Sequence, residues 1–428
     1  MASPAPAHVD SYYASSVGSL VDRPALSGEQ SCEVCVVGGG LTGVSTALNL
    51  AEAGVDVILL EAHRIGWGAS GRNGGQAQTG FGGEIEDLEP LVGPGAARSL
   101  WDMTVTGLKI IEDRCARHDI ACDLKHGYLL AVAKARNMAA HESWVERAKR
   151  VYGYDRFRLL DRDAVRGEIA TDRYHGGILD HGSMHLHPLK YCLGLAGAAA
   201  SAGARLYEAS RVVRIETRAR LTIETEHGMV RADQVILACN AFPAPFDGGL
   251  ETRIMPVGTY ICATEPLEEG RARDLIPNDI SVCDDRHVLD YFRLSADRRM
   301  LFGGRESVSR ATPADLAHTM RRRMLRVFPQ LADVEIGPVW GGEIALTRNR
   351  FPDIGRIAPN IYYAQGFSGH GVALSGVVGK VLAEAIAGES AGLDLFGAIP
   401  HRPFPGGTFL RAPLMRLGLL WYRLKDFL

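Results

Sequence analysis

A glycine triplet in the order G-x-G-x-x-G, at Gly38, Gly40 and Gly43, constrains this chain more than any other feature. An apolar, valine-rich run at residues 34–37 comes directly before it and predicts a buried parallel strand. In such a turn the first glycine permits the tight bend, the second lets the backbone approach a pyrophosphate, and the third lets helix and strand pack closely. The triplet therefore predicts a nucleotide-binding turn between a strand and a helix.

The residues after the triplet complete the pattern. A helical periodicity begins at Leu41 and Thr42 and stops at Gly54, and a second apolar strand over residues 55–60 ends in Glu61. The amides and the dipole at a helix start attract phosphates, and an acid about twenty residues further on can accept hydrogen bonds from a ribose. Taken together in this order, the elements predict a dinucleotide-binding site.

A second glycine-rich stretch, AHRIGWGASGRNGGQ, runs from Ala62 to Gln76. It is too polar and too rich in glycine for a helix or a strand, so we expect a loop that lies against a ligand. The alternative is a plain surface loop, which rarely needs so many glycines. An NAD enzyme would usually continue here into another strand–helix repeat. The cofactor contacts that we expect from this loop are Ala62, Arg64, Gly68, Ala69, Ser70, Arg72, Asn73, Gly74, Gly75 and Gln76.

Glu61 followed by GWGASGRNGGQ resembles the FAD-binding segment of the D-amino-acid oxidase and glycine/sarcosine oxidase superfamily. Within this superfamily, the chain is most similar to the gamma-glutamylputrescine oxidoreductases. The GFSGHG motif is shared with sarcosine oxidases generally, so it is specific to the superfamily rather than to the branch. The resemblance covers nearly the whole chain and includes SYY at 11–13, HLHPLKY at 185–191, VILACNAF at 235–242, WGGEIALTRNRFPDIGR at 340–356, YYAQGFSGHGVALSGVVGK at 362–380 and FPGGTFLRAPL at 404–414.

The resemblance implies an α/β and α+β fold, in which a Rossmann-like FAD-binding domain is joined to a substrate domain with a mixed antiparallel sheet. The expected divisions are a lead-in at 1–29, a discontinuous FAD-binding domain at 30–87, 185–243 and 345–395, a substrate or cap domain at 88–184 and 244–344, and a tail at 396–428. Further FAD contacts implied by the resemblance are Val213 (or its neighbour Val212, either of which would face the adenine), Ala238, Cys239, Asn240, Gly366, Ser368, Gly369, His370, Gly371 and Val372.

Periodicity places the remaining elements. The predicted helices are 96–118, 138–152, 185–204, 314–327 and 372–386. The predicted strands are 205–207, 211–216, 221–225, 235–239, 258–263, 288–294, 299–303 and 362–364.

The reaction implied by the resemblance is flavin-dependent oxidation of an amine, in which a hydride passes to the flavin and the imine hydrolyses to an aldehyde. The helix after GFSGHG can aim its amides at the flavin edge where negative charge develops, and His370 either contributes or makes a structural hydrogen bond. Tyr260, Tyr291 and Arg293, on predicted substrate-domain strands, are candidates to line the pocket. Two alternatives stay open: an oxidase or dehydrogenase of amino acids or N-methyl amino acids, and an FAD-binding subunit without turnover of its own.

The substrate is predicted from an arginine that is missing. Oxidases of small amino acids grip the α-carboxylate with a guanidinium. In glycine oxidases this Arg lies a few residues after a Trp, on the strand before a Pro-x-x-Gly turn. Counting from Trp340 to a turn at Pro352–Gly355, the matching residue is Ile344, which cannot pair with a carboxylate. Because Glu343 suits a cationic or neutral amine, we expect an amine carbon distant from any carboxylate, with gamma-glutamylputrescine the leading candidate.

The mode of FAD attachment and the electron acceptor follow from the same comparison. Some relatives attach FAD through a His in the glycine-rich loop or a Cys before GFSGHG. Residues 64–76 contain neither, and residues 341–361 contain no Cys, so non-covalent FAD is expected. Sarcosine oxidases keep a Lys near the flavin to activate oxygen, and residues 298–304 contain none. Oxygen or another electron acceptor therefore remains open.

Composition limits the partners and the location. A net charge of −3 gives no reason to expect nucleic acid or an anionic membrane as a partner. No apolar run reaches the ~18 residues of a membrane helix, and the N-terminus lacks the basic and apolar regions of a signal peptide. We expect a cytoplasmic enzyme whose partner is a small amine. Whether it forms an oligomer stays open.

Eight cysteines outside a secretory context are expected to be free thiols. Cys32 and Cys35 form a C-x-x-C, but on a strand an offset of three points their side chains to opposite faces. His181, His185 and His187 are clustered before a predicted helix, and we interpret them as loop and capping residues. No metal site is expected.

The C-terminal residues 414–428, LMRLGLLWYRLKDFL, form an amphipathic and basic segment. Such a helix can bind a membrane surface or a partner. We favour the alternative, docking on its own chain or on a sister subunit.

Overall fold

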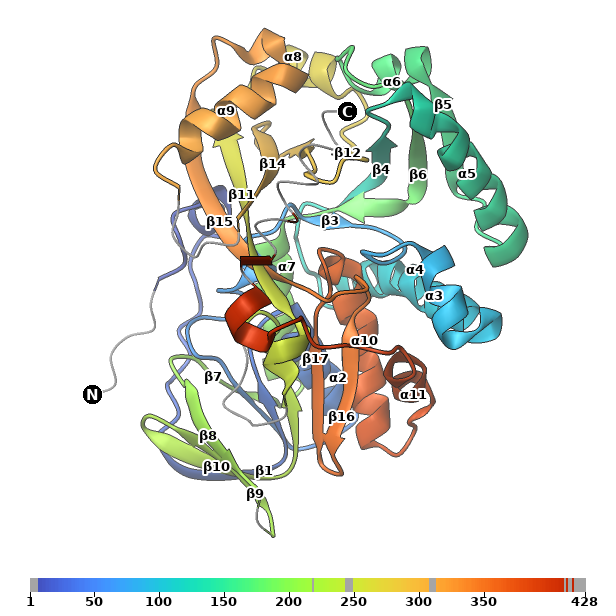
Figure 1. Cartoon of the computed structure of the whole chain (residues 1–428). Helices are drawn as coiled ribbons and strands as arrows, with labels where there is room; N and C mark the ends of the chain where they lie inside the picture. The colour runs from blue at the N-terminus through green and yellow to red at the C-terminus, as the bar shows by residue number, and fades with distance from the viewer. Residues whose placement is uncertain are drawn as a thin grey trace.

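The structure is a computed structural model that describes residues 7–217, 219–242, 249–307, 313–411, 413–414 and 418. Two large mixed sheets organise this part of the chain, and we call them sheet A and sheet B. Sheet A lies at the bottom of Figure 1 and sheet B at the top. The expected combination of α/β and α+β architecture is confirmed. The predicted helix at 414–428 falls almost wholly outside the described residues.

The glycine triplet follows β1, an inner strand of sheet A, at the carboxyl end of that strand. Its strands are β1 (Gly28–Val37), β2 (Val57–Leu60), β7 (Arg205–Tyr207), β8 (Val212–Glu216), β9 (Leu221–Thr225), β10 (Gly228–Leu237), β16 (Asp353–Ala358) and β17 (Ile361–Gln365). The main order is β16-β17-β10-β1-β2-β7. β1 is parallel to both β2 and β10, which places Val37 beside Leu60 and Leu237. The carboxyl ends of the three strands therefore meet at one edge, where ligands bind in open α/β sheets.

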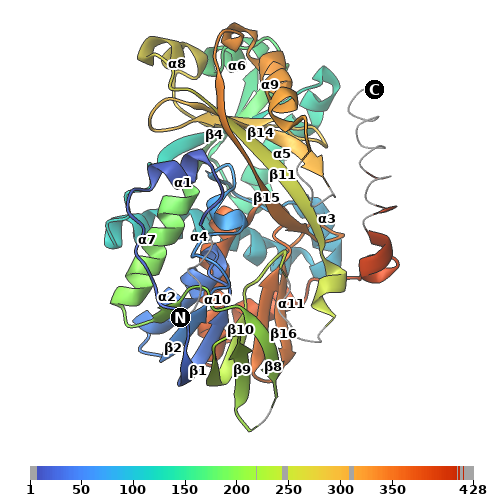
Figure 2. The same cartoon turned by 90° about the vertical axis from the view of Figure 1, so that its left-hand side faces the viewer.

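Helices cover one face of sheet A, and the β8–β9 pair covers the other (Figure 1). The helices on the first face include α2 (Leu41–Glu52), α7 (Pro188–Ser201) and α10 (Gly371–Ile386). α2 and α10 pack so closely that a Cβ added at Gly379 would lie 2.6 Å from Ser45 Oγ. Both helices begin at the sheet edge that carries the glycine triplet (Figure 2).

Sheet B runs in the order β15-β11-β14-β13-β12-β4-β6-β3, and β5 pairs with β6. Its strands are β3 (Gln76–Ala77), β4 (Lys125–Ala131), β5 (Phe157–Asp161), β6 (Gly176–His185), β11 (Met255–Thr264), β12 (Ser281–Asp284), β13 (Tyr291–Leu294), β14 (Met300–Ser307) and β15 (Ile336–Leu346). All described pairings are antiparallel except β12 with β4. α9 (Leu316–Val327) buries Met320 and Met324 against this sheet.

The other helices in the described part of the chain are α1 (Tyr12–Ser16), α3 (Ile85–Val92), α4 (Pro94–Arg117), α5 (Met138–Tyr152), α6 (Arg162–Glu168), α8 (Glu269–Leu275) and α11 (Ala391–Gly397). α5 matches the predicted helix at 138–152 in both bounds. The predicted helix at 96–118 corresponds to α4, but its packing differs from the expected place in the substrate domain. α4 packs against α10, and its Arg114 donates a hydrogen bond to Ser45 of α2. A helix with one apolar stripe does not reveal which sheet it will cover.

Two local predictions are wrong. His185 was expected to open a helix, but it is the last residue of β6, and α7 begins at Pro188 with His187 as its N-cap. The turn expected at Pro352–Gly355 lies earlier, at residues 348–351, so that Asp353 already pairs with Gln365 in sheet A. The glycine at position 355 is there because the ring of Tyr363 leaves little room for a Cβ, at 3.1 Å from the phenol oxygen.

The eight cysteines all lie within the described residues and are free thiols. No single helix in the described ranges is long and apolar enough to cross a membrane. Taken together, α10 and α11 would be long and apolar enough, but the pair is bent by 119°. Most of α10 is buried in the core that α2 and α4 share.

Candidate active site

The glycine turn after β1 has room for no side chain. Gly38 adopts a φ of +110°, and a Cβ there would lie 2.6 Å from the Ala238 carbonyl oxygen. A Cβ on Gly43 would lie 1.8 Å from the Gly38 carbonyl oxygen. These contacts are with backbone atoms, which cannot rotate away, so the turn and the helix behind it need glycine at both positions.

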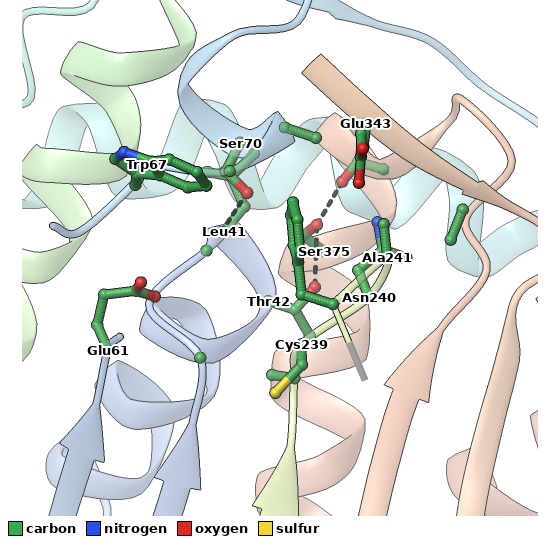
Figure 3. Close-up of a pocket in the computed structure, with 18 of the residues that line it drawn as sticks. Leu41, Thr42, Glu61, Trp67, Ser70, Cys239, Asn240, Ala241, Glu343 and Ser375 are labelled. Carbon is green, nitrogen blue, oxygen red and sulfur yellow. Dashed lines mark hydrogen bonds between the residues drawn. The ribbon is translucent and has the colours of Figure 1, made fainter. Parts of the chain in front are cut away.

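The start of α2 faces an open cavity. Its N-cap, Gly40, offers no side-chain acceptor to the first turn, and Ser70 Oγ accepts a hydrogen bond from Leu41 N at 2.9 Å. A Cβ on Gly40 would meet the same Ser70 Oγ at 2.8 Å. Thr42 lines the cavity one residue further on (Figure 3). A helix start with a bare backbone, a positive dipole end and a cavity in front is suited to hold phosphate groups.

Glu61 lies at the end of β2, beside the turn. Its two carboxylate oxygens accept hydrogen bonds from Gly39 N at 2.6 Å and His63 N at 2.8 Å. Burial raises the pKa of this carboxyl group, and the two backbone donors oppose the rise. The side chain is thereby held in one orientation at the cavity wall, where its remaining lone pairs can accept from a sugar hydroxyl.

The cavity runs from Glu61 past the start of α2 to the start of α10 (Figure 3). Many of the residues expected to contact the cofactor line it. They are Gly38, Gly40, Leu41, Thr42, Glu61, Ala62, Gly68, Ala69, Ser70, Asn73, Ala238, Cys239, Asn240, Ser368, Gly369, Gly371 and Val372.

Other expected contacts lie outside this wall, namely Gly43, Arg64, Arg72, Gly74, Gly75, Gln76, Val213, Gly366 and His370. Gly43 lies behind the turn, and Arg64 pairs with Asp22 at 3.4 Å. Val213 is 46% exposed, whereas its neighbour Val212 faces the cavity. Successive residues of a strand point to opposite faces, and the sequence left open which of the two valines looks inward.

Several lining residues were not expected as contacts. They are Val37, Leu60, His63, Trp67, Ser210, Arg211, Ala241, Phe242, Ala345, Phe367 and Ser375. Glu343 and Ile344 also line the cavity, and the sequence had related both to the substrate. Glu61, Ala62 and His63 all line the cavity. Because Glu61 and Ala62 were expected contacts, the next residue, His63, could also have been predicted. Ser375 lies one helical turn after Gly371, which also could have been found from periodicity.

An aromatic wall stands on one side of the cavity. The Trp67 ring stacks on His63 with ring centres 4.0 Å apart, and Arg72 lies over Trp67 at 4.1 Å from the ring centre. Phe242 meets Trp67 edge to face at 6.2 Å. Arg72 therefore supports the wall through a cation–π contact, while its NH1 group donates to the Gly341 carbonyl oxygen at 3.4 Å.

The GFSGHG turn leads into α10 through several residues with a left-handed backbone conformation. Gly366, Ser368 and Gly369 have φ angles of +74°, +52° and +94°. Ser368 Oγ donates to the Gly366 carbonyl oxygen at 3.1 Å, which helps a non-glycine residue hold this conformation. Burial lowers the pKa of His370 to about 4, so its imidazole is neutral at neutral pH and brings no positive charge to the cavity.

The strand residues expected to line a substrate pocket are outside the wall of this cavity. Tyr260 packs against Gly341, and Tyr291 packs against Gly74 and Gly303. Arg293 is 3% exposed, and each of its three side-chain nitrogens donates to a protein oxygen. The structure therefore places Arg293 away from this cavity, and an alternating strand pattern does not tell which face of the strand meets the cavity.

The chemistry of this cavity defines a class of protein. One cavity is faced by the starts of α2 and α10, by Glu61 at the end of β2 and by a glycine turn without side chains. This arrangement suits a dinucleotide cofactor that carries an aromatic ring system at each end. FAD fits these residues: Gly40, Leu41 and Ser70 would hold its phosphates, and Glu61 would hold a ribose. Within the described residues, no group of three or more His, Cys, Asp or Glu side chains could hold a metal ion.

Comparisons with known proteins agree with this class. The family described as FAD dependent oxidoreductase (DAO) matches residues 33–385, and the chain belongs to this family. It is 42% identical to gamma-glutamylputrescine oxidoreductase of Escherichia coli (strain K12) over 420 residues, 98% of each chain. The protein is thus an FAD-dependent oxidoreductase.

Solved structures share the fold at low sequence identity. L-proline dehydrogenase from P. horikoshii aligns with a TM-score of 0.73 at 21% identity, covering 86% of this chain and 96% of that one. Glycine oxidase from Geobacillus kaustophilus aligns with a TM-score of 0.73 at 20% identity, covering 88% and 100%.

Proposed function

We propose that this protein oxidises a primary amine carbon that lies far from any carboxylate, and that a gamma-glutamylated amine such as gamma-glutamylputrescine is its substrate. The similarity to the Escherichia coli enzyme over nearly the full length of both chains supports this proposal. The proposal goes beyond the family, whose members act on amines and amino acids.

The cavity wall at β15 is the observation that carries the proposal. Glu343, Ile344 and Ala345 line the cavity there. Ile344 is the residue that we aligned with the carboxylate-binding Arg of glycine oxidases, and its side chain offers no partner to a carboxylate. A buried carboxylate without a partner would cost several kcal/mol. Arg211 is the guanidinium among the described lining residues, and it lies by His63, at 3.4 Å from Nε2.

Glu343 gives the same wall an acidic character. A carboxylate beside the reacting amine attracts the ammonium form of the substrate and lowers the cost of bringing it out of water. When bound, FAD supplies the hydride acceptor, and the imine that is released hydrolyses to an aldehyde. The residues of the chain position the amine and exclude water around it.

We further propose where the parts of the molecule belong. The FAD-binding part comprises residues 30–87, 185–243 and 345–395, with α4 packed on it, and the substrate part is built on sheet B. A cytoplasmic location and a non-covalent cofactor belong to the same proposal. Oxygen or another electron acceptor completes the cycle.

The test is steady-state turnover with an artificial electron acceptor on gamma-glutamylputrescine, putrescine, glycine, sarcosine and D-alanine. We expect the highest kcat/KM on gamma-glutamylputrescine. A higher kcat/KM on the three amino acids than on both amines would falsify the proposal. Anaerobic mixing with each compound is the control, because loss of the flavin absorbance reports reduction without any acceptor.

A further inference from the structure

Two cysteines outside the cavity have their sulfur atoms in contact. Cys115 lies in the last turn of α4, and Cys122 lies in the connection to β4. Their Sγ atoms are 3.5 Å apart, at hydrogen-bond distance for sulfur. The connection folds back on the helix end because Ile120 N donates to the Cys115 carbonyl oxygen at 3.0 Å.

The two thiols differ in exposure. Cys115 is half-buried, whereas Cys122 is 1% exposed. The hydrogen bond from Cys122 lowers the pKa of the Cys115 thiol, while the same bond and burial raise the pKa of Cys122. A half-buried thiol beside a buried partner thiol is the arrangement in which one cysteine meets an oxidant and the second resolves it.

We propose that Cys115 and Cys122 are a site of reversible oxidation that closes an intramolecular disulfide when the protein meets hydrogen peroxide. The Cys115 thiolate attacks the peroxide, so that an S–O bond forms, the O–O bond breaks, and water leaves after protonation. Cys122 then attacks the sulfenic sulfur, so that the S–S bond forms, the S–O bond breaks, and a second water leaves. Two thiols are oxidised, one peroxide is reduced to two waters, and an external thiol reverses the reaction.

The neighbourhood of the pair connects it to the cofactor side of the molecule. The Cys122 carbonyl oxygen accepts a hydrogen bond from His187 N at 2.7 Å, at the start of α7. The next residue along the connection, Asp123, pairs with Lys190 of α7 at 2.8 Å. Neither contact uses the Cys122 thiol, so the formation of the disulfide does not require that either contact to α7 be broken.

The sequence makes the product easy to detect. Trypsin cleaves after Arg114, Arg117 and Lys125, which places Cys115 and Cys122 on two separate short peptides. The FAD-loaded protein is treated with hydrogen peroxide, the free thiols are blocked, and the protein is digested without reductant. We expect the two peptides joined in one species, two hydrogen atoms lighter than their sum, and the loss of two of the eight thiols. Dithiothreitol restores both.

Three variants sharpen the experiment. Cys122→Ala removes the resolving thiol, so Cys115 should accumulate sulfinic acid, and Cys115→Ser should abolish the cross-link with no sulfinic acid at position 122. Cys32→Ala, a buried cysteine of β1, is the matched control and should leave the joined peptides unchanged. Recovery of both peptides unlinked from oxidised wild-type protein, with either eight free thiols or a sulfinic acid on Cys115, would overturn the proposal.

Discussion

Arg293 Nε donates a hydrogen bond to the carbonyl oxygen of Gly74 at 2.7 Å, and this bond joins sheet B to the glycine-rich loop of the cofactor cavity. The other donors of the same guanidinium go to the carbonyl oxygens of Leu186 and Leu294 and to the Tyr13 hydroxyl, at 2.8, 3.0 and 3.2 Å. A buried cation is held here by neutral oxygens. It fixes the backbone next to Asn73, which lines the cavity.

Replacing Arg293 with Met should destabilise the protein, because three buried carbonyl oxygens would lose their donor. We expect a loss of roughly 2–4 kcal/mol in the free energy of unfolding, together with weaker FAD binding. Urea unfolding and titration of the apoprotein with FAD measure the two effects. Arg273→Met is the matched control, because Arg273 is exposed and pairs with Glu269 within α8. Equal stability of the two variants would contradict the assigned role.

Gly40→Ala should weaken FAD binding, and a second substitution should partly restore it. The added Cβ meets the side chain of Ser70, so Ser70→Gly in the same chain removes the collision. We expect a loss of roughly tenfold, about 1.4 kcal/mol, for Gly40→Ala and a smaller loss for the pair. Gly43→Ala should not be rescued, because its Cβ collides with the Gly38 backbone. Gly197→Ala on α7, with open space around it, is the control.

The protein should release its FAD when it is denatured in acid. Cys239 lines the cavity, but burial raises the pKa of its thiol to about 12, and the thiol donates to the Val37 carbonyl oxygen at 3.3 Å. A protonated thiol is a poor nucleophile, so Cys239 is not activated for covalent attachment. Precipitation with trichloroacetic acid should leave the yellow colour in the supernatant. A yellow pellet that stays yellow after washing would show a covalent link.

Stability should fall as the pH drops below about 6.5, and His187 should contribute to the fall. Its Nδ1 accepts a hydrogen bond from Lys190 N at 3.1 Å, so this atom carries no proton. Burial lowers the pKa of His187 to about 3. The unfolded chain therefore binds a proton first, and the stabilising contribution, fully present above pH 6.5, is lost progressively down to pH 3, at up to ~1.4 kcal/mol per pH unit.

His187→Asn should flatten this dependence, because Asn also caps helices but does not titrate. The free energy of unfolding of both proteins, measured from pH 7.5 to pH 4, tests the expectation. His181→Asn, at an exposed position of β6, serves as the control and should keep the wild-type slope. Parallel curves for wild type and His187→Asn would show that another group is responsible.

Glu343→Gln should raise KM for a cationic amine about tenfold with a smaller change in kcat, because it removes the negative charge from the β15 wall while it keeps the shape of the side chain. A second measurement is KM at rising ionic strength. The KM of the wild-type enzyme should rise with salt more than the KM of the variant does, because salt screens the charge of Glu343. An unchanged KM in Glu343→Gln would place the amine elsewhere in the cavity.

Local pattern was enough for α5 and for the strand β9, because both rest on contacts between residues close in the sequence; β9 pairs with its chain neighbours β8 and β10. It was also enough for the acid at Glu61, whose position relative to the turn is set by one βαβ unit. The limits appear at Val213 and Arg293. Both lie on strands, where alternation identifies two faces but does not tell which of them meets the cavity.

Trp67 and Glu343 show a second limit. They come from segments far apart in the sequence, and they enter one cavity because sheet B is packed against the edge of sheet A. The glycine-rich loop with Trp67 could be predicted from the sequence, but its distance from Glu343 on β15 depends on how the two sheets pack together. The same holds for α4, whose apolar stripe could have served either sheet and is buried against α10.

The order of the strands in sheet A has a consequence for how the enzyme is made. β1, which carries the turn, pairs with β10, so that Gly28 lies opposite Gly228, and β10 in turn pairs with β17. When the ribosome has translated only the first half of the chain, β1 and the glycine turn can already have β2 beside them, but β10, on the other side of β1, has not yet been made. The start of α10 emerges later still. The wall of the cofactor cavity is therefore incomplete until the start of α10, near residue 375, has been translated.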